Sequence, residues 1–188
     1  MDQTSIVRNL ACWLDANKWN PSLALVYDLC SYGVAGESHR GALYMGAKER
    51  GLGRRTQVAQ PDILVRREDI RTVELVVEVD FGGRKSGQLV APSPKRLTGL
   101  FLAAAAADNH TPSNKYNDEY KLHDTIIVVV TAYATEKLRQ YDQEFADELF
   151  RRFHVAERGV RELCICGGPT QEHIECSFQE LTRSRFFI

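Results

Sequence analysis

The chain has 188 residues, of which 44% are hydrophobic and 26% charged, and its formal net charge is -1. This length and composition are typical of one globular domain and leave no room for a second large one. No stretch has the roughly 18 to 20 uninterrupted apolar residues that span a bilayer, so we expect no membrane association. The near-zero charge excludes a global attraction to polyanions, and any binding of nucleic acid requires a local basic surface.

The N-terminus and the cysteines indicate the compartment. Residues 1–10 contain an early acid and no cationic flank before an apolar run, which is unlike a secretory signal. The cysteines are odd in number and scattered, which argues against a disulfide framework. They are Cys12, Cys30, Cys164, Cys166 and Cys176. We therefore expect an intracellular protein, cytoplasmic or nuclear, with reduced thiols.

Residues 1–32 predict two short helices. Apolar residues recur at helical intervals from Ile6 to Leu14. Asn20 followed by Pro21 is typical of a helix start, which predicts a second helix over the run SLALVYDLC.

A third helix and two strands follow. The helix is predicted to begin at Glu37 and to end at the glycines 51 and 53. Residues 57–66 (QVAQPDILVR) and 73–81 (VELVVEVDF) have strand character. The second of these runs is almost continuously apolar and mostly β-branched, so we expect a central strand covered on both faces.

The rest of the chain predicts further helices and strands. Residues 95–109 form an alanine-rich, strongly apolar helix packed on a sheet. Residues 124–133 are the clearest strand, and because Thr125–Tyr133 is apolar on both faces, we expect it at the centre of the sheet and parallel to a neighbour. Residues 135–153 form an amphipathic helix with Leu138, Tyr141, Phe145, Leu149 and Phe153 on one face. The remaining segments are a polar surface loop and two short strands, at residues 110–120, 161–167 and 173–181.

Acidic residues in the middle of the chain suggest a metal site. Pro61-Asp62 lies on one predicted strand, and Glu78-Val79-Asp80 lies on the next. Asp62 and Glu78 converge if their strands pair, and Glu78 and Asp80, two residues apart, project to the same face. A carboxylate on a strand of valines is costly to desolvate unless a cation or hydrogen bonds meet it. Mg²⁺ held by such acids offsets charge on a phosphorus under attack and helps to deprotonate water.

This order of elements with its acids resembles the core of the PD-(D/E)XK nuclease superfamily, over roughly residues 33–133. The family motif is a Pro-Asp on one strand and an acid-x-Lys on the next, and Glu37, at the start of the preceding helix, matches a frequent third member. The resemblance implies an α/β fold with a mixed central β-sheet flanked by helices, a restriction-endonuclease-like core. It also implies Mg²⁺- or Mn²⁺-dependent phosphodiester hydrolysis on DNA or RNA.

The sequence departs from the family pattern at one position. Asp80 stands where the motif has lysine. Lys85, after the strand, and Lys95, at the start of the next helix, are replacements that could orient the attacking water. Some members resemble this arrangement, with the lysine on the following helix, and Lys95 is therefore preferred. Asp80 is alternatively a metal ligand in its own right.

Basic residues flank these acids along the chain, at Lys48, Arg50, Arg54, Arg55, Arg84, Lys85, Lys95 and Arg96. They suit phosphate contacts on either side of a scissile bond, and equally a solvated charged surface. Together, these features predict a single domain of three parts. They are a helical N-terminal extension (residues 1–32), a nuclease-like core (33–133) and a C-terminal helix with short strands (134–188).

Several other interpretations stay open. The fold can be another α/β sandwich in which Asp62 and Glu78 are surface acids at strand ends. The protein can also be a catalytically inactive nuclease-fold module that binds nucleic acid or a protein partner, which the missing lysine favours, or a domain that forms homodimers through its apolar C-terminal RFFI. A zinc site is disfavoured, because the spacing of Cys164-x-Cys166, His173 and Cys176 is unlike that of a zinc knuckle and cysteines of this kind are commonly core residues.

Overall fold

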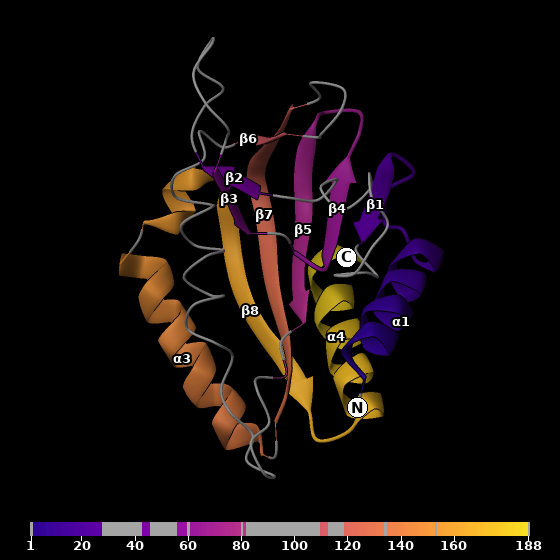
Figure 1. Ribbon diagram of the computed structural model, residues 1–188, viewed down its shortest axis with the longest axis vertical. Coiled ribbons are helices and arrows are strands. Elements are labelled where there is room, and N and C mark those ends of the chain that lie inside the picture. The colour runs from indigo at the N-terminus through magenta and orange to yellow at the C-terminus, as the bar shows by residue number, and fades with distance from the viewer. Residues whose placement is uncertain are drawn as a thin grey trace.

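The computed structural model describes residues 2–27, 43–45, 56–59, 61–79, 81, 110–112, 119–133, 135–152 and 154–187. Figure 1 shows a β-sheet with helices beside it. The described elements, in chain order, are α1 (Gln3–Ala16), β1 (Leu23–Tyr27), β2 (Leu43–Met45), β3 (Thr56–Ala59), β4 (Ile63–Arg67), β5 (Thr72–Val79), β6 (His110–Pro112), β7 (Glu119–Ala132), α3 (Glu136–Arg152), the 3-10 helix η1 (Val155–Arg158), β8 (Val160–Gly168) and α4 (Gln171–Phe186).

The sheet is six-stranded and mixed. Its order is β1-β4-β5-β7-β6, and β8 pairs with β7 as well. The pairs β1–β4, β4–β5 and β6–β7 are antiparallel, whereas β5, β7 and β8 run parallel to one another. The predicted α/β class is thus confirmed, and so is the central position of β7, whose residues Thr125–Tyr133 are buried between two parallel neighbours.

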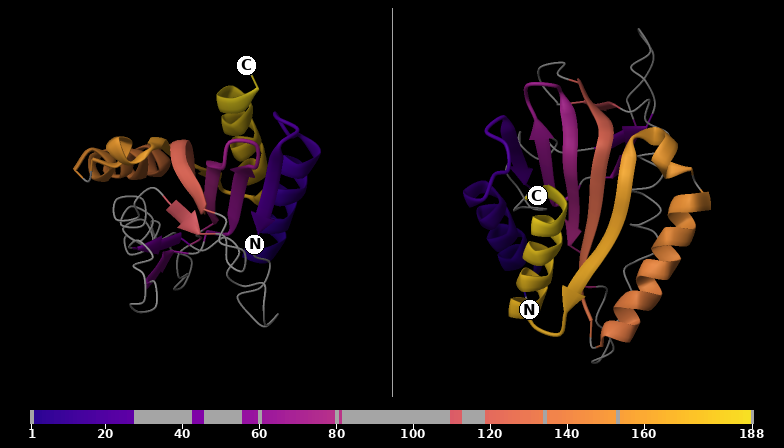
Figure 2. Two further views of the ribbon diagram at one scale, coloured as in Figure 1. Left: turned by 90° about the horizontal axis from the view of Figure 1, so that it is seen from above. Right: turned by 180° about the vertical axis from the view of Figure 1, so that it is seen from behind.

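Two apolar cores lie on opposite faces of the sheet. On the first face, α1 and α4 pack side by side over the strands (Figure 2). The first core includes Leu10, Ile63, Val77, Val128 and Phe178. The alternate residues of the same strands point to the second face, where they form the second core. It includes Leu64, Val76, Val129, Ala146 and Ile165. The alternation of two along each strand thus divides its side chains between the two cores.

Helix α3 lies beside the edge of the sheet, along β8 (Figures 1 and 2). Three backbone groups of β8 bond to side chains of this helix: Gln143 donates to the Leu163 carbonyl (2.9 Å) and accepts from the Ile165 N–H (2.7 Å). Arg139 donates to the Ile165 carbonyl at 3.0 Å. These bonds occupy an edge that would otherwise be open to pairing with another strand.

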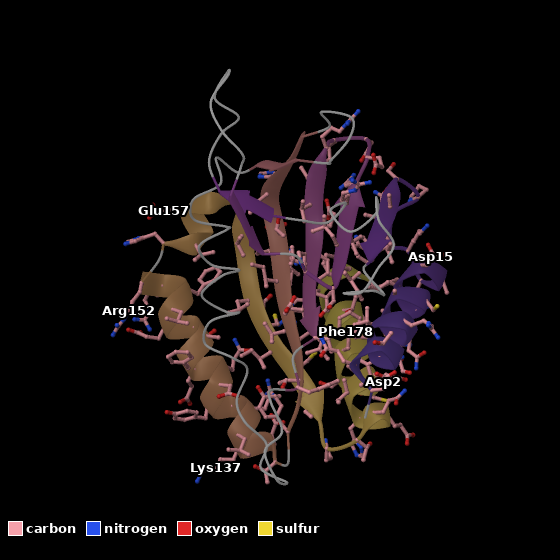
Figure 3. All side chains as sticks on the ribbon, viewed as in Figure 1. Asp2, Asp15, Lys137, Arg152, Glu157 and Phe178 are labelled. Carbon is pink, nitrogen blue, oxygen red and sulfur yellow. The ribbon has the colours of Figure 1, made fainter. Side chains whose placement is uncertain are left out.

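All three α-helices of the described residues begin at the same end of the sheet, where the parallel strands end. Gln3, in the first turn of α1, bonds to the Val79 carbonyl at the end of β5. Helices α3 and α4 each begin a few residues after β7 and β8 end, respectively. In Figure 3, Asp2 and Lys137 mark the starts of α1 and α3, while Asp15 and Arg152 mark their far ends. None of these helices is long and apolar enough to cross a membrane.

The predicted helix over SLALVYDLC is wrong, because residues 23–27 form β1, at the edge of the sheet. Asn20 does not cap a helix there. Its side chain accepts from the Ser22 N–H at 2.8 Å, which is a turn that leads into a strand. Residues 1–32 are therefore not a helical extension, because β1 is an integral strand.

The predicted helix that begins at Glu37 is wrong in its described part, since residues 43–45 form β2, paired with β3. The predicted strand over 57–66 is split into β3 and β4. Between them lies Pro61, which has no N–H to donate to a strand neighbour. The predicted loop over 110–120 contains β6 and the start of β7.

The strand predicted over residues 173–181 is also wrong, because α4 covers this segment. Thr170 caps the helix by accepting from the His173 N–H. Ile174 and Phe178 are four residues apart, so they share one side of a helix, and both are fully buried. The C-terminal part of the chain thus has one strand, two α-helices and one 3-10 helix among its described residues. The predicted alanine-rich helix over 95–109 lies outside them.

Candidate metal centre

Asp62 and Glu78 lie at neighbouring positions near the carboxyl end of β5. Asp62 immediately precedes β4, and Glu78 is the next-to-last residue of β5. Ile63 pairs with Val77 in the antiparallel register. Continuing this register by one residue places Asp62 opposite Glu78. Cβ atoms of directly opposite residues are about 4.5 to 5.5 Å apart, a separation that one bound cation can bridge.

Glu78 belongs to the second face of the sheet. On β5 it follows Val76 by two residues, and Val76 is part of the second core. Its parallel neighbour on β7 is Val129, from the same core. Glu78 is only 8% exposed. A carboxylate at such a buried position needs hydrogen bonds or a cation to compensate for lost hydration.

The Asp62 carboxylate is turned toward the backbone of β5. Its Oδ2 accepts from the Val79 N–H at 2.7 Å, and the Val79 carbonyl accepts from the Gln3 side chain at 2.6 Å. Side chains from two other parts of the chain therefore hold both backbone groups of Val79. This contact fixes Asp62 beside the end of β5, and it is also what a purely structural acid at a strand end would do.

The donor set fits part of a Mg²⁺ site. Two carboxylates supply the hard oxygen ligands that this ion takes, and the ion commonly keeps several waters besides. Within the described residues, no three or more His, Cys, Asp or Glu side chains form a group that could hold a metal. Asp62 and Glu78 can therefore supply two ligands, and a third protein ligand does not come from this part of the chain.

The other predicted site residues lie outside the described residues. They are the acids Glu37 and Asp80, the lysines Lys85 and Lys95, and the basic residues Lys48, Arg54, Arg55, Arg84 and Arg96.

Two features of this end of the sheet escape prediction from sequence. Thr131, near the end of β7, is 1% exposed, and its hydroxyl has no hydrogen-bond partner in the described part of the chain. Tyr133 donates its hydroxyl to Asp142 Oδ2 of α3 at 2.9 Å, and both side chains are buried. Burial raises the pKa of Tyr133 and the pKa of Asp142. In the sequence, a threonine after three valines indicates only a strand.

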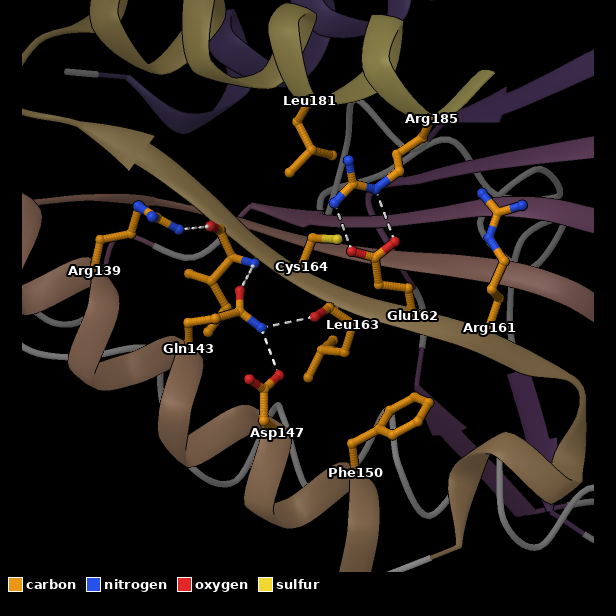
Figure 4. A pocket seen from close by; sticks show the side chains of 11 residues that line it. Arg139, Gln143, Asp147, Phe150, Arg161, Glu162, Leu163, Cys164, Leu181 and Arg185 are labelled. Carbon is orange, nitrogen blue, oxygen red and sulfur yellow. Dashed lines mark hydrogen bonds and ion pairs between the residues drawn. The ribbon is translucent and has the colours of Figure 1, made fainter. Parts of the chain in front are cut away.

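A groove of about 430 Å³ runs along β8 between α3 and α4 (Figure 4). Glu162 and Arg185 form an ion pair in it: both nitrogens Nε and Nη2 of Arg185 donate to the Glu162 carboxylate, at 2.8 and 2.7 Å. Burial raises the pKa of the Cys164 thiol, which disfavours the nucleophilic thiolate. The groove lies two strands away from Glu78, and its lining residues have no arrangement for catalysis.

The cysteines of β8 are core residues. Cys164 and Cys166 are buried in the first core, whereas Cys176 is exposed on α4. With His173 they form no group that could hold a metal. At the C-terminus, Phe186 stacks on Trp19 with ring centroids 4.1 Å apart, and Phe187 remains 40% exposed.

Comparisons with protein-family models, with curated proteins and with solved structures give no match to this chain. The function of the protein is therefore inferred from its residues and their geometry.

Proposed function

We propose that the protein is a Mg²⁺-dependent nuclease with a restriction-endonuclease-like core. The observation that carries this proposal is the strand register, which brings Asp62 and Glu78 together at the end of two adjacent strands. The mixed sheet, with the Pro-Asp and the second acid on neighbouring strands, agrees with the arrangement that the resemblance implies. Fold alone does not confer this chemistry, so the acids carry the argument.

In the proposed site, Asp62 and Glu78 bind the ion, with Asp80 and Glu37 as further candidates. Bound Mg²⁺ would polarise the phosphate and lower the pKa of a coordinated water. Val79 holds Asp62 in place through its N–H, so the ligand is positioned before the ion binds. Lys95 or Lys85 would stand beside the attacking water, and the flanking basic residues would contact the phosphate backbone.

Cleavage of single- and double-stranded DNA and RNA with Mg²⁺ or Mn²⁺ tests the proposal, and Mn²⁺ binding by calorimetry gives an independent measurement. Asp62→Asn and Glu78→Gln should each lower kcat by at least about a hundredfold, the usual scale for a group that acts on the transition state. The asparagine keeps an oxygen that can accept from Val79, so Asp62→Asn separates loss of charge from loss of the strand contact.

Glu74→Gln is the matched control, because Glu74 lies on the same strand and its carboxylate accepts from the Thr72 hydroxyl. This variant should cleave and bind Mn²⁺ within about twofold of the wild type, a difference of less than about 0.5 kcal/mol. Unchanged cleavage in Asp62→Asn, or no cleavage of any substrate by the wild type, contradicts the proposal.

A second candidate is a catalytically inactive module of the same fold that binds nucleic acid or a protein partner. The bond from Val79 to Asp62 favours it, because a structural acid at a strand end requires no metal. This candidate predicts that the wild type binds oligonucleotides without cleaving them. If the basic flanks contribute, the affinity should fall linearly with salt concentration on a logarithmic plot.

A further inference from the structure

Among the described residues, four threonine side chains are buried. In three of them the hydroxyl donates a hydrogen bond of 2.6 to 3.2 Å. The fourth, Thr131, is 1% exposed and its Oγ1 has no partner. The three bonded pairs are Thr72 with the Glu74 carboxylate, Thr125 with the Val73 carbonyl and Thr182 with the Phe178 carbonyl.

A buried hydroxyl without a partner lowers stability, because the group loses its bonds to water and gains none in the protein. Thr131 directly follows Val128, Val129 and Val130 on β7, and a fourth valine would have nearly the same shape without this cost. Thr125, on the same strand, shows that a threonine there can be fully bonded within the chain. Among the described residues, the Thr131 hydroxyl therefore lacks an acceptor, and a bound group can supply one.

Thr131 lies on the face of the sheet that carries Glu78. In the parallel register, Glu78 is opposite Val129, and Thr131 follows Val129 by two residues, so it projects to the same side. Two residues advance about 7 Å along a strand and adjacent strands are about 5 Å apart, so the Cα atoms of Thr131 and Glu78 are roughly 8 Å apart. On its other side, the neighbour of Thr131 is Gly167, which has no side chain.

The polar groups nearby have partners of their own. The Tyr133 hydroxyl donates to Asp142, and the Gly167 N–H bonds to the Ser177 hydroxyl. Neither group needs the Thr131 hydroxyl, so that hydroxyl can donate to a group bound between Thr131 and Glu78. A phosphate held by a metal on Glu78 would bring such an acceptor, because the two residues are close on the same face.

We propose that Thr131 is a substrate-binding residue of the Asp62 and Glu78 site, and that its hydroxyl donates a hydrogen bond to an oxygen of a metal-bound phosphate. This inference rests on the proposed function, and it adds to that function a group on β7 beyond the acids of β4 and β5. Thr131 holds the phosphate and takes no part in proton transfer.

The test compares Thr131→Val, Thr131→Ser and Thr125→Val. The melting temperature without metal should rise by about 2 °C in Thr131→Val, because the unbonded hydroxyl is gone, and should fall in Thr125→Val, which loses a bond. Affinity is measured with Ca²⁺, which binds the same oxygen donors, for the oligonucleotide that the wild type cleaves fastest or otherwise binds most tightly. Thr131→Val should weaken it about tenfold or more, the scale of a hydrogen bond to a charged group. Thr131→Ser, which keeps the hydroxyl, should stay within about threefold.

The outcomes separate this inference from the proposed function. If the wild type cleaves and Thr131→Val cleaves and binds equally well, the inference is wrong and the nuclease proposal stands. If the wild type binds without cleaving and Thr131→Val binds more weakly, the nuclease proposal is wrong and Thr131 remains a binding residue. If Thr131→Val melts lower, as Thr125→Val should, or if no oligonucleotide binds, the inference is overturned.

Discussion

Helices α3 and α4 flank the same strand, β8, but they contact it in opposite ways (Figure 4). Helix α4 packs an apolar side on the first face of the sheet and buries Ile174 and Phe178 completely. Helix α3 instead directs Arg139 and Gln143 at the edge of β8, where they bond to backbone groups. A helix over a sheet face is stabilised by burial of apolar surface, whereas a helix along a sheet edge must satisfy polar groups.

The difference explains which side of α3 is buried. The apolar face that the sequence predicts includes Leu138, Tyr141 and Phe145, which are 45%, 70% and 44% exposed. The fully buried members of the helix are Asp142 and Ala146. The helix is correctly predicted, but an apolar face normally faces the core, and of the described members of this face only Leu149 packs against the second core. Apolar periodicity therefore identifies a helix without identifying its inner side when the neighbour is a strand edge.

The largest difference in the free energy of unfolding is expected between two phenylalanine variants, one in each helix. Phe178→Ala in α4 should lower the free energy of unfolding by about 3 to 5 kcal/mol, because it empties a fully buried site in the first core. Phe145→Ala in α3 should cost less than about 1 kcal/mol, because 44% of that side chain is already exposed. Urea unfolding measures both, and similar losses would show that α3 is packed like α4.

A smaller effect is expected from the edge contacts of α3. Gln143→Ala removes the partners of the Leu163 carbonyl and the Ile165 N–H, and should cost about 1 to 3 kcal/mol. Hydrogen exchange at the Ile165 amide should accelerate in the same variant. Gln140→Ala, at an exposed position one turn earlier, is the control and should change neither measurement. Unaltered exchange in Gln143→Ala would show that the edge does not depend on this side chain.

The buried acid of α3 should make the protein less stable as the pH rises. Burial raises the pKa of Asp142, against the opposing hydrogen bond from Tyr133. For a raised pKa, the contribution to stability is complete below the usual value, near pH 4, and is lost as the pH rises through the value in the folded state. Asp142→Asn keeps an acceptor for Tyr133 and cannot ionise. Thermal melts should show it to be more stable than the wild type at pH 7 and equal to it near pH 3.

Glu162, the acid that joins β8 to α4, should have the opposite and smaller effect on stability: it should stabilise the protein more as the pH rises. The hydrogen bonds from Arg185 lower the pKa of Glu162, so its contribution is present above the usual value and is lost as the pH falls through the lowered one. Both side chains are about one-third exposed, which limits the pair to about 1 kcal/mol or less. Glu162→Gln should be slightly less stable at pH 7 and equal to the wild type below about pH 3, in the same melts. A loss that persists at low pH would assign the effect to packing.

The sequence predicts an element correctly where the spacing of its apolar residues fits either a helix or a strand, but not both. The valine-rich runs of β5 and β7 are long, β-branched and buried on both faces, so they can only be central strands. By contrast, the five apolar residues of β1 fit a helix as well as a strand, and only the pairing of Leu25 with Val65 and its neighbours decides. In α4, the spacing of Ile174 and Phe178 contains the helical signal, but the alternation of Ile174, Cys176 and Phe178 with polar residues is equally typical of a strand.

The candidate site is predictable only where charge is conspicuous against an apolar background. Asp62 and Glu78 stand out among aliphatic residues, and the register of β4 and β5 is consistent with their expected proximity. Thr131 does not stand out, because threonine is an ordinary strand residue. Its significance depends on whether an acceptor lies near its hydroxyl, and that is a property of tertiary structure which spacing along the chain does not encode.

Helices α1, α3 and α4 all have their N-termini at the same end of the sheet, so their dipoles point the same way along the strands. Each helix carries the equivalent of about half a positive elementary charge at its first turn, and three such ends lie at the same edge of the sheet as Asp62 and Glu78. Asp2, at the N-cap of α1, and Glu136 and Glu172, in the first turns of α3 and α4, offset this charge. Arginines in the last turns of α3 and α4 offset the opposite ends in the same way, so the side-chain charges run against the helix dipoles. The acids gathered at the starting end, with Asp62 and Glu78 beside them, would attract a cation before a polyanion.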